Sequence, residues 1–106
     1  MRRDIFKNRF NSDIQLSDEE RKSIIERSIK NVHWKLRCTI AMEELAELGQ
    51  QVSKQIRGIG DRLGLIEEMA DVYICLTQLE SIFNISHDDL QKAIDIKMVA
   101  LKHKTK

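Results

Sequence analysis

The 106-residue chain contains no proline and only four glycines, three of which fall between Gly58 and Gly64. Proline and glycine interrupt helices, so their scarcity favours long, uninterrupted helices. Aromatic residues make up only 5% of the chain although hydrophobic residues reach 42%, so the core should be aliphatic. The length suits a single domain. These features predict an all-α protein without a second domain.

Neither sign of charge predominates, because 18 basic residues face 17 acidic ones and leave a formal net charge of +1. Such a balance gives no broad field that would attract nucleic acid or an anionic membrane. No run approaches the roughly 20 apolar residues of a membrane span. Cys38 and Cys75 are isolated, without the spacing of a zinc site or a disulfide framework. We therefore expect a soluble cytoplasmic protein with no nucleic-acid and no membrane partner.

Capping signals and periodicity divide the chain into an N-terminal arm, residues 1–16, and one helical domain, residues 17–106. Ser17 and Glu20 form a capping-box sequence at the start of the first helix. Helices are predicted over residues 18–30, 32–56, 63–83 and 87–102. Two glycines between the second and third helices supply a turn. These two helices should therefore form an antiparallel hairpin.

The last three predicted helices each carry an apolar stripe at helical spacing. In the second helix the stripe consists of Trp34, Ala41, Leu45, Leu48, Val52 and Ile56. In the third helix it consists of Leu65, Met69, Val72, Leu76, Leu79 and Phe83. In the fourth helix it consists of Leu90, Ile94, Met98 and Leu101. We expect the stripes to be buried and to pack the second helix against the third.

Two dense acidic clusters lie in the second and third predicted helices, Glu43-Glu44-Leu45-Ala46-Glu47 and Glu67-Glu68-Met69-Ala70-Asp71. Side chains three residues apart share a helix face, so each cluster can direct two carboxylates the same way. Glu44 with Glu47, and Glu68 with Asp71, flank the stripes in the same rotational sense. The first glutamate of each cluster lies opposite the stripe and should be solvated. An antiparallel hairpin packed by its stripes would bring both pairs to one side of the helix interface.

Converging carboxylates repel one another unless a cation lies between them, since close like charges cannot all stay ionised. Oxygen ligands without Cys or His suit a hard cation, so Mg²⁺, or Mn²⁺ in its place, is favoured over Zn²⁺. A single ExxE pair would be an ordinary solvated helix face. Two such pairs with matching geometry on neighbouring helices instead predict a metal site made by Glu44, Glu47, Glu68 and Asp71.

The two acidic motifs and their spacing resemble the ExxE…ExxD signature of the MazG-like all-α nucleoside triphosphate pyrophosphohydrolases. Residues 40–48 are similar to the first motif helix of that family, and residues 65–72 to the second. Residues 94–97 resemble a following helix that carries a basic residue. The similarity covers residues 30–100, which is most of the chain. It implies a four-helix, MazG-like bundle completed by association of identical chains into a dimer or tetramer.

The resemblance also implies a reaction, the hydrolysis of a nucleoside or deoxynucleoside triphosphate to a monophosphate and pyrophosphate, often to cleanse the nucleotide pool. Glu44, Glu47, Glu68 and Asp71 would then be catalytic and would hold Mg²⁺ against the phosphates. The metal would neutralise phosphate charge, orient a water and lower the pKa of that water. One of these acids, or a neighbouring glutamate, would accept the proton.

Basic residues near the motifs are candidate phosphate contacts. Lys97 corresponds to the basic residue of the family's following helix, although Ala100 and Leu101 stand where that helix often has an arginine. Lys54 and Arg57 lie at the end of the second helix and could reach a phosphate. The alternative interpretation is that these two residues only complement the helix dipole.

The candidate base-binding residues are Trp34 and His33, which lie two to three turns before Glu44. An indole ring can stack on a nucleobase. Trp34 also falls on the apolar stripe of its helix, so packing in the core is the alternative interpretation.

Three other classes of protein share parts of this pattern. A phosphoribosyl-ATP pyrophosphohydrolase carries similar acidic motifs, but the apolar run after Asp71 lacks the histidine expected in that group. A di-iron four-helix protein needs Glu-x-x-His pairs, and no histidine follows Glu44 or Glu68 at that spacing. A non-catalytic nucleotide-binding or helical interaction module is the third alternative, and the retention of all four acids argues against it.

Overall fold

The structure, a computed structural model, describes the backbone of residues 3–105 and the side chains of residues 5–105. It consists of five helices, α1 (Arg3–Phe10), α2 (Asp18–Lys30), α3 (Trp34–Ile56), α4 (Arg62–Ile82) and α5 (His87–Lys104). No strand occurs in the described residues, so the prediction of an all-α protein is confirmed. None of these helices is long and apolar enough to cross a membrane. The predicted N-terminal arm contains α1, and its first two residues lie outside the described part.

Local capping signals determine where α2 and α3 begin. The Ser17 hydroxyl accepts a hydrogen bond from the backbone N–H of Glu20 at 3.1 Å, and the Glu20 carboxylate accepts one from the backbone N–H of Ser17 at 3.3 Å. This reciprocal capping box starts α2 where it was predicted. Before α3, the His33 ring nitrogen accepts a hydrogen bond from the backbone N–H of Lys35 at 3.2 Å. The helix therefore begins after His33, two residues later than predicted.

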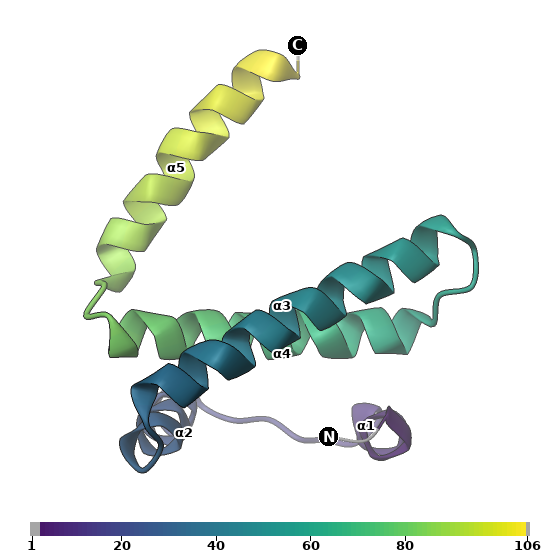
Figure 1. Cartoon of the computed structure of the whole chain (residues 1–106), viewed down its shortest axis with the longest axis horizontal. Coiled ribbons are helices and arrows are strands. Elements are labelled where there is room, and N and C mark those ends of the chain that lie inside the picture. Colours follow the sequence, from purple (N-terminus) through teal and green to yellow (C-terminus); the bar gives the residue numbers. More distant parts are fainter. Residues whose placement is uncertain (1–2, 106) are drawn as a thin grey trace.

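The antiparallel α3–α4 hairpin is the central element of the fold, and both α1 and α2 also contact α4 (Figure 1). Gly58 makes the hairpin turn possible, since its φ of +75° is strained for residues with a side chain. Asp61 caps the start of α4 and also lies 3.2 Å from the ammonium of Lys7 in α1. Gln78 of α4 donates a hydrogen bond to the Ser28 hydroxyl of α2 at 2.9 Å. The hairpin is thus the platform on which the two N-terminal helices rest.

The inner side of the hairpin is lined by residues that alternate at spacings of three and four. We call these residues the inner seam: Arg37, Ala41, Glu44, Leu48 and Gln51 on α3, and Gly64, Glu68, Asp71, Cys75 and Gln78 on α4. Every one of them is buried or part-buried. This spacing is that of the contact positions in a coiled coil, but most of the side chains are polar or charged instead of apolar. The two helices therefore meet through a largely hydrophilic interface.

Several large aliphatic residues of the predicted stripes lie outside this seam, whereas Leu48 belongs to it. Leu45 and Val52 of α3, and Met69 and Leu76 of α4, keep 43 to 50% of their surface exposed. We call these four residues the outer face. The prediction that the stripes close the hairpin is therefore wrong for them. The physical reason is that α3 and α4 are turned so that the acidic flank of each stripe points inward. Ala41 and Leu48 of the α3 stripe still line the seam, while the far side of each stripe stays exposed.

The expected solvation of the first glutamate in each cluster holds for only one of the two helices. Glu43 is exposed, as predicted, whereas Glu67 is only 5% exposed. The prediction for Glu67 is wrong because α4 is covered by α1, α2 and α3 together. Burial therefore extends round more of α4 than a hairpin of two helices alone would give.

Helix α5 projects from the end of α4 and makes no extensive contact with another helix (Figure 1). Asn84, with a φ of +56°, forms the turn that separates the two helices. The predicted burial of the α5 stripe is wrong, because Ile94, Met98 and Leu101 are all between 42 and 57% exposed. Within residues 3–105, one chain alone therefore does not close a bundle of four helices.

Candidate metal centre

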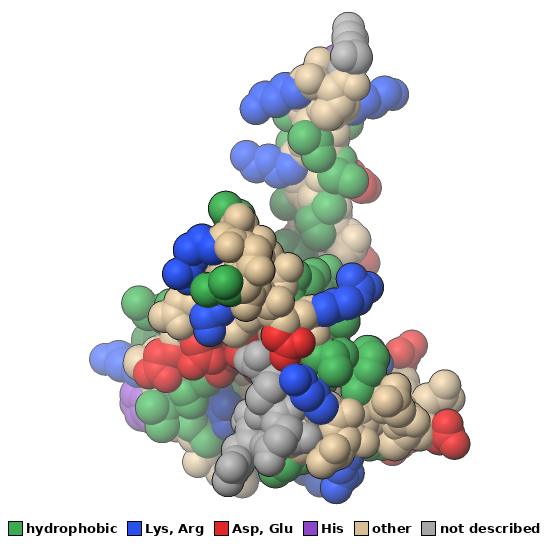
Figure 2. Space-filling model, turned by 90° about the vertical axis from the view of Figure 1, so that its right-hand side faces the viewer, with side chains coloured by type: hydrophobic (Ala, Val, Ile, Leu, Met, Phe, Trp, Pro, Cys, Tyr) green, Lys and Arg blue, Asp and Glu red, His purple; other side chains and the backbone are tan. Residues whose placement is uncertain are grey.

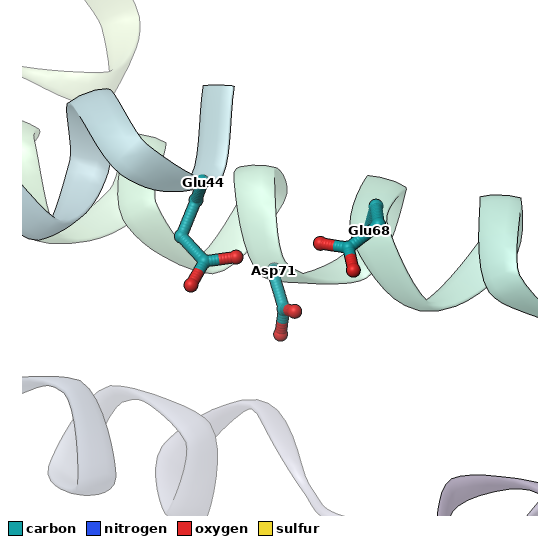
Figure 3. A group of neighbouring side chains, drawn as sticks. All are labelled: Glu44, Glu68 and Asp71. Atoms are coloured by element: carbon teal, nitrogen blue, oxygen red, sulfur yellow. The ribbon is translucent and has the colours of Figure 1, made fainter. Parts of the chain in front are cut away.

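Three of the four predicted carboxylates come together across the inner seam. Glu44 extends from α3, while Glu68 and Asp71 extend from α4, one turn apart. One carboxylate oxygen of each lies within 4.8 Å of the others. All three side chains point to the same side of the hairpin, the side on which α2 lies (Figure 3). The i, i+3 spacing on α4 and the antiparallel direction of α3 produce this convergence.

The cluster perturbs its own acidity. The pKa of Glu44 is raised from 4.5 to about 7, first by burial and then by the negative charges of Asp71, Glu47 and Glu68. The pKa of Asp71 is also raised, first by burial and then by the charge of Glu67. A hydrogen bond between Glu44 and Asp71 favours a proton on Glu44 and a charge on Asp71. In the absence of a cation, Glu44 of the folded chain therefore keeps its proton up to a pH well above the usual pKa of a glutamate.

The donor set fits a hard divalent cation. Oxygen Oε2 of Glu44 is buried and has no hydrogen-bond partner among the residues that the structure describes, and Glu68 is only 7% exposed. A buried acceptor without a donor is costly, and a cation would satisfy it while cancelling the repulsion among the three acids. The ligands are all carboxylate oxygens, the type that Mg²⁺ and Mn²⁺ prefer. Glu44, Glu68 and Asp71 could therefore hold such an ion.

Glu47, the fourth predicted ligand, stands apart from this group. Its side chain is exposed, and no oxygen of Glu47 joins the three-residue cluster. Its charge nevertheless contributes to the raised pKa of Glu44, so it lies close to the centre. The structure thus brings together three of the four predicted acids and leaves Glu47 at the edge.

The predicted phosphate contacts are not brought to the acids within one chain. Lys54 and Arg57 lie near the end of α3, at least about 15 Å beyond Glu44 along the helix axis. The Arg57 guanidinium instead donates to the backbone carbonyl of Ser53 at 3.4 Å. Lys97 is exposed on α5, which projects away from the side to which the acids point.

The predicted base-binding pair lies at the other end of α3, ten residues or about 15 Å before Glu44. Trp34 stacks on His33 and makes an edge contact with Phe83, with ring centroids 6.1 Å apart in both pairs. It lines a small apolar recess together with Ile29 and Ile82. About half of the indole is exposed, so Trp34 both packs against α4 and keeps a free surface. His33 has an additional structural role as the cap of α3.

Arg37 is a candidate functional residue that the sequence motifs missed. It lies seven residues before Glu44 on the same side of α3, and its charge acts on the Cys75 thiol together with the charges of Glu44 and Asp71. Burial, followed by the two carboxylates, raises the pKa of Cys75, and Arg37 opposes this shift. The guanidinium Nε of Arg37 is buried without a hydrogen-bond partner among the described residues. Arg37 therefore places a buried, unsatisfied Nε near Cys75, two turns of α3 before Glu44.

Gln51 occupies the equivalent position seven residues after Glu44. It is 8% exposed, and its carbonyl oxygen has no hydrogen-bond partner in the described part of the chain. The heptad spacing of Arg37, Glu44 and Gln51 was the available signal for both residues, since positions seven apart share a helix face. Neither residue belongs to an ExxE motif.

Comparisons with models of known protein families, with curated proteins and with solved structures find no match to this chain.

Proposed function

We propose that the protein is a magnesium-dependent pyrophosphohydrolase that cleaves a nucleoside or deoxynucleoside triphosphate of the cytoplasmic pool to a monophosphate and pyrophosphate. The observation that supports this proposal is the carboxylate triad of Glu44, Glu68 and Asp71 with its buried, unsatisfied oxygen. The resemblance of the two acidic motifs to MazG-like enzymes supplies the reaction. Mn²⁺ would satisfy the same donor set.

The triad and its neighbours suit a substrate that is both anionic and metal-bound. A divalent cation bound to phosphate neutralises its charge and activates a water for attack on phosphorus. Glu44, Glu68 and Asp71 hold the cation, and Glu47, one turn after Glu44, completes the acidic set when its side chain turns inward. Arg37 donates to a phosphate oxygen, because a guanidinium matches the geometry of phosphate. Trp34 offers a ring face to the base.

The proposal includes association of identical chains into a dimer or tetramer, as the resemblance implies. The amount of apolar surface that one chain leaves exposed supports this part of the proposal. A partner chain would also explain why neither Lys97 nor any other residue of α5 contributes to the site of its own chain.

The reaction is tested with a panel of standard and damaged nucleoside triphosphates in the presence of Mg²⁺, with pyrophosphate and single phosphate measured separately. We expect pyrophosphate and a nucleoside monophosphate as the products. Glu44→Gln and Asp71→Asn should abolish turnover, because each removes one charged ligand. Glu43→Gln is the matched control, since Glu43 is exposed on the other side of the same helix turn and should leave turnover intact.

Other results would redirect the assignment. Turnover that survives both ligand substitutions, or release of single phosphate only, would remove the proposed reaction. Cleavage of phosphoribosyl-ATP alone would favour that narrower substrate. If no triphosphate is cleaved but one of them raises the melting temperature only with Mg²⁺, the chain is a nucleotide-binding module.

A further inference from the structure

Arg37 is a cationic group toward one end of the triad. It lies about 10 Å before Glu44 along α3, in the direction of Trp34. A bound triphosphate carries more negative charge than one divalent cation cancels, and the triad adds its own carboxylates. A second cationic group toward the other end, near the α3–α4 turn, would therefore stabilise an extended chain of phosphates.

Helix α1 brings basic residues to that other end. Its eight residues include three basic ones and one acidic one. The Lys7 ammonium lies 3.2 Å from the carboxylate of Asp61, and Asp61 is two turns, or about 10 Å, before Glu68 along α4. Helix α1 lies on the side of the hairpin to which the triad points (Figures 1 and 3), and acidic and basic side chains adjoin each other on the face at the α3–α4 turn (Figure 2). The triad is thus flanked along the hairpin by Arg37 at one end and by Lys7 at the other.

The attachment of α1 to the rest of the chain is loose. Among its described side chains, those of residues 5–10, Phe6 alone is part-buried. The side chains of Lys7 and Asp61 are 46 and 43% exposed, and an exposed ion pair of this kind contributes little stability. Residues 11–16, which join α1 to α2, are exposed and belong to no helix. A helix of eight residues is also too short to be stable alone in water. Little free energy is therefore needed to move α1 relative to the hairpin.

We propose that α1 is a lid over the metal centre, and that Lys7 leaves Asp61 to bind the terminal phosphates of the substrate, those released as pyrophosphate. The ammonium of a lysine is a point charge that suits phosphate oxygens. The order of groups along the hairpin assigns the two ends of the substrate. The base lies toward Trp34, the phosphates run from Arg37 across the triad, and the last of them lie toward Lys7. This inference rests on the proposed function, because it gives a direction to the bound triphosphate.

The test titrates inorganic tripolyphosphate into the Mn²⁺-loaded chain by calorimetry. Lys7→Ala should weaken its binding about 10-fold, because the substitution removes a charge-assisted hydrogen bond. The same variant should bind Mn²⁺ alone as the natural chain does, since Lys7 is not a metal ligand. Arg9→Ala is the matched control. Arg9 is exposed on the opposite side of α1, so this variant loses the same charge and should bind tripolyphosphate normally.

Asp61→Asn separates a phosphate contact from a purely structural ion pair. It breaks the same pair as Lys7→Ala, while asparagine remains a good cap for the start of α4. With Lys7 released from the carboxylate, tripolyphosphate should bind at least as tightly as it does to the natural chain. Equal weakening in Asp61→Asn and Lys7→Ala would show that the pair only holds α1 in place, and would overturn the proposal.

Amide hydrogen exchange follows the lid directly. The α1 amides should exchange rapidly in the Mn²⁺-loaded chain and should become protected when tripolyphosphate is added, in the natural chain but not in Lys7→Ala. Exchange in α3 and α4 checks that each variant is folded, and Lys7→Gln takes the place of Lys7→Ala if that variant is not. An α1 whose exchange does not respond to tripolyphosphate overturns the lid.

The same measurements distinguish failure of the lid from failure of the proposed function. If triphosphates are cleaved while Lys7→Ala binds tripolyphosphate as the natural chain does, the lid is excluded and the pyrophosphohydrolase proposal stands. If the chain binds no tripolyphosphate even when it is loaded with Mn²⁺, the lid and the proposed function both fail.

Discussion

A helical hairpin in water normally buries apolar side chains and exposes charged ones. The α3–α4 hairpin shows the reverse, with charged side chains in its inner seam and aliphatic side chains on its outer face. The seam is buried or part-buried and contains Arg37, Glu44, Glu68 and Asp71, whereas the outer face is aliphatic and close to half exposed. Burial of charge is unfavourable unless the charge is paired or bound to a metal. Exposure of a continuous aliphatic surface is equally unusual in a monomer.

The buried charges of the inner seam and the exposed aliphatic side chains of the outer face together indicate that the two faces have different roles. Acids occupy buried positions in the inner seam that apolar side chains would otherwise fill, which reduces hydrophobic stabilisation there. The aliphatic side chains lie on the outer face instead. The proposed metal centre and the exposed aliphatic surface thus belong to different faces of the same two helices.

Loss of one carboxylate from the triad should have the largest effect. Glu68→Gln should weaken Mn²⁺ binding by at least about 100-fold. Changing a residue that only hydrogen-bonds to a metal ligand already lowers metal affinity about 10- to 100-fold. Isothermal titration calorimetry of the metal alone measures this without reference to turnover. Glu43→Gln should bind Mn²⁺ as the natural chain does. Equal affinity in the Glu68 and Glu43 variants would show that the seam is acidic for a reason unrelated to metal.

Removal of the cationic donor from the seam should affect substrate binding more than chemistry. Arg37→Gln should raise KM about 10- to 100-fold, because a charge-assisted hydrogen bond contributes about 1.5–3 kcal/mol. Arg37→Lys should recover only part of the loss, since an ammonium lacks the planar fork of donors. The kinetic measurement is a comparison of KM and kcat at saturating Mg²⁺. An unchanged KM in Arg37→Gln would mean that Arg37 serves only the packing of α3.

Sequence reasoning succeeded where the determinants are local. The capping box of Ser17 and Glu20 fixed the start of α2, and the i, i+3 spacing on α4 placed Glu68 and Asp71 together. It failed where burial depends on what packs against a helix. The prediction that each apolar stripe faces the interior of a single chain missed both the polar side chains of the inner seam and the exposure of α5.

Stability without metal should depend on pH, and the comparison with Glu44→Gln isolates the contribution of Glu44. Because its pKa is raised to about 7 in the folded chain, the folded state binds the Glu44 proton more tightly than the unfolded state. The resulting stability is present below pH 4.5 and is lost as the pH rises through 7. At pH 8 in EDTA, Glu44→Gln should therefore be more stable than the natural chain, by about 2 kcal/mol or about 10 °C in Tm.

The control for this prediction is the pH dependence of the difference in Tm between the natural chain and Glu44→Gln. At pH 4 the natural Glu44 is protonated and neutral, so the two proteins should melt at nearly the same temperature. Excess Mg²⁺ at pH 8 should reverse the order, because it stabilises only the chain that retains the ligand. A Glu44→Gln variant that is less stable at pH 8 in EDTA would contradict a repulsive triad.

The smallest effect is expected at Gln51, a polar but uncharged residue that is buried in the inner seam. Its carbonyl oxygen has no partner in the described residues, so Gln51→Met should remove a desolvation penalty while nearly preserving shape. We expect a gain of about 1 kcal/mol, or about 5 °C in Tm, measured by circular dichroism. Gln50→Met, on the exposed side of the same turn, should change nothing. A loss of stability in Gln51→Met would show that this amide is satisfied in solution, and that the seam holds α3 to α4 through a complete polar network.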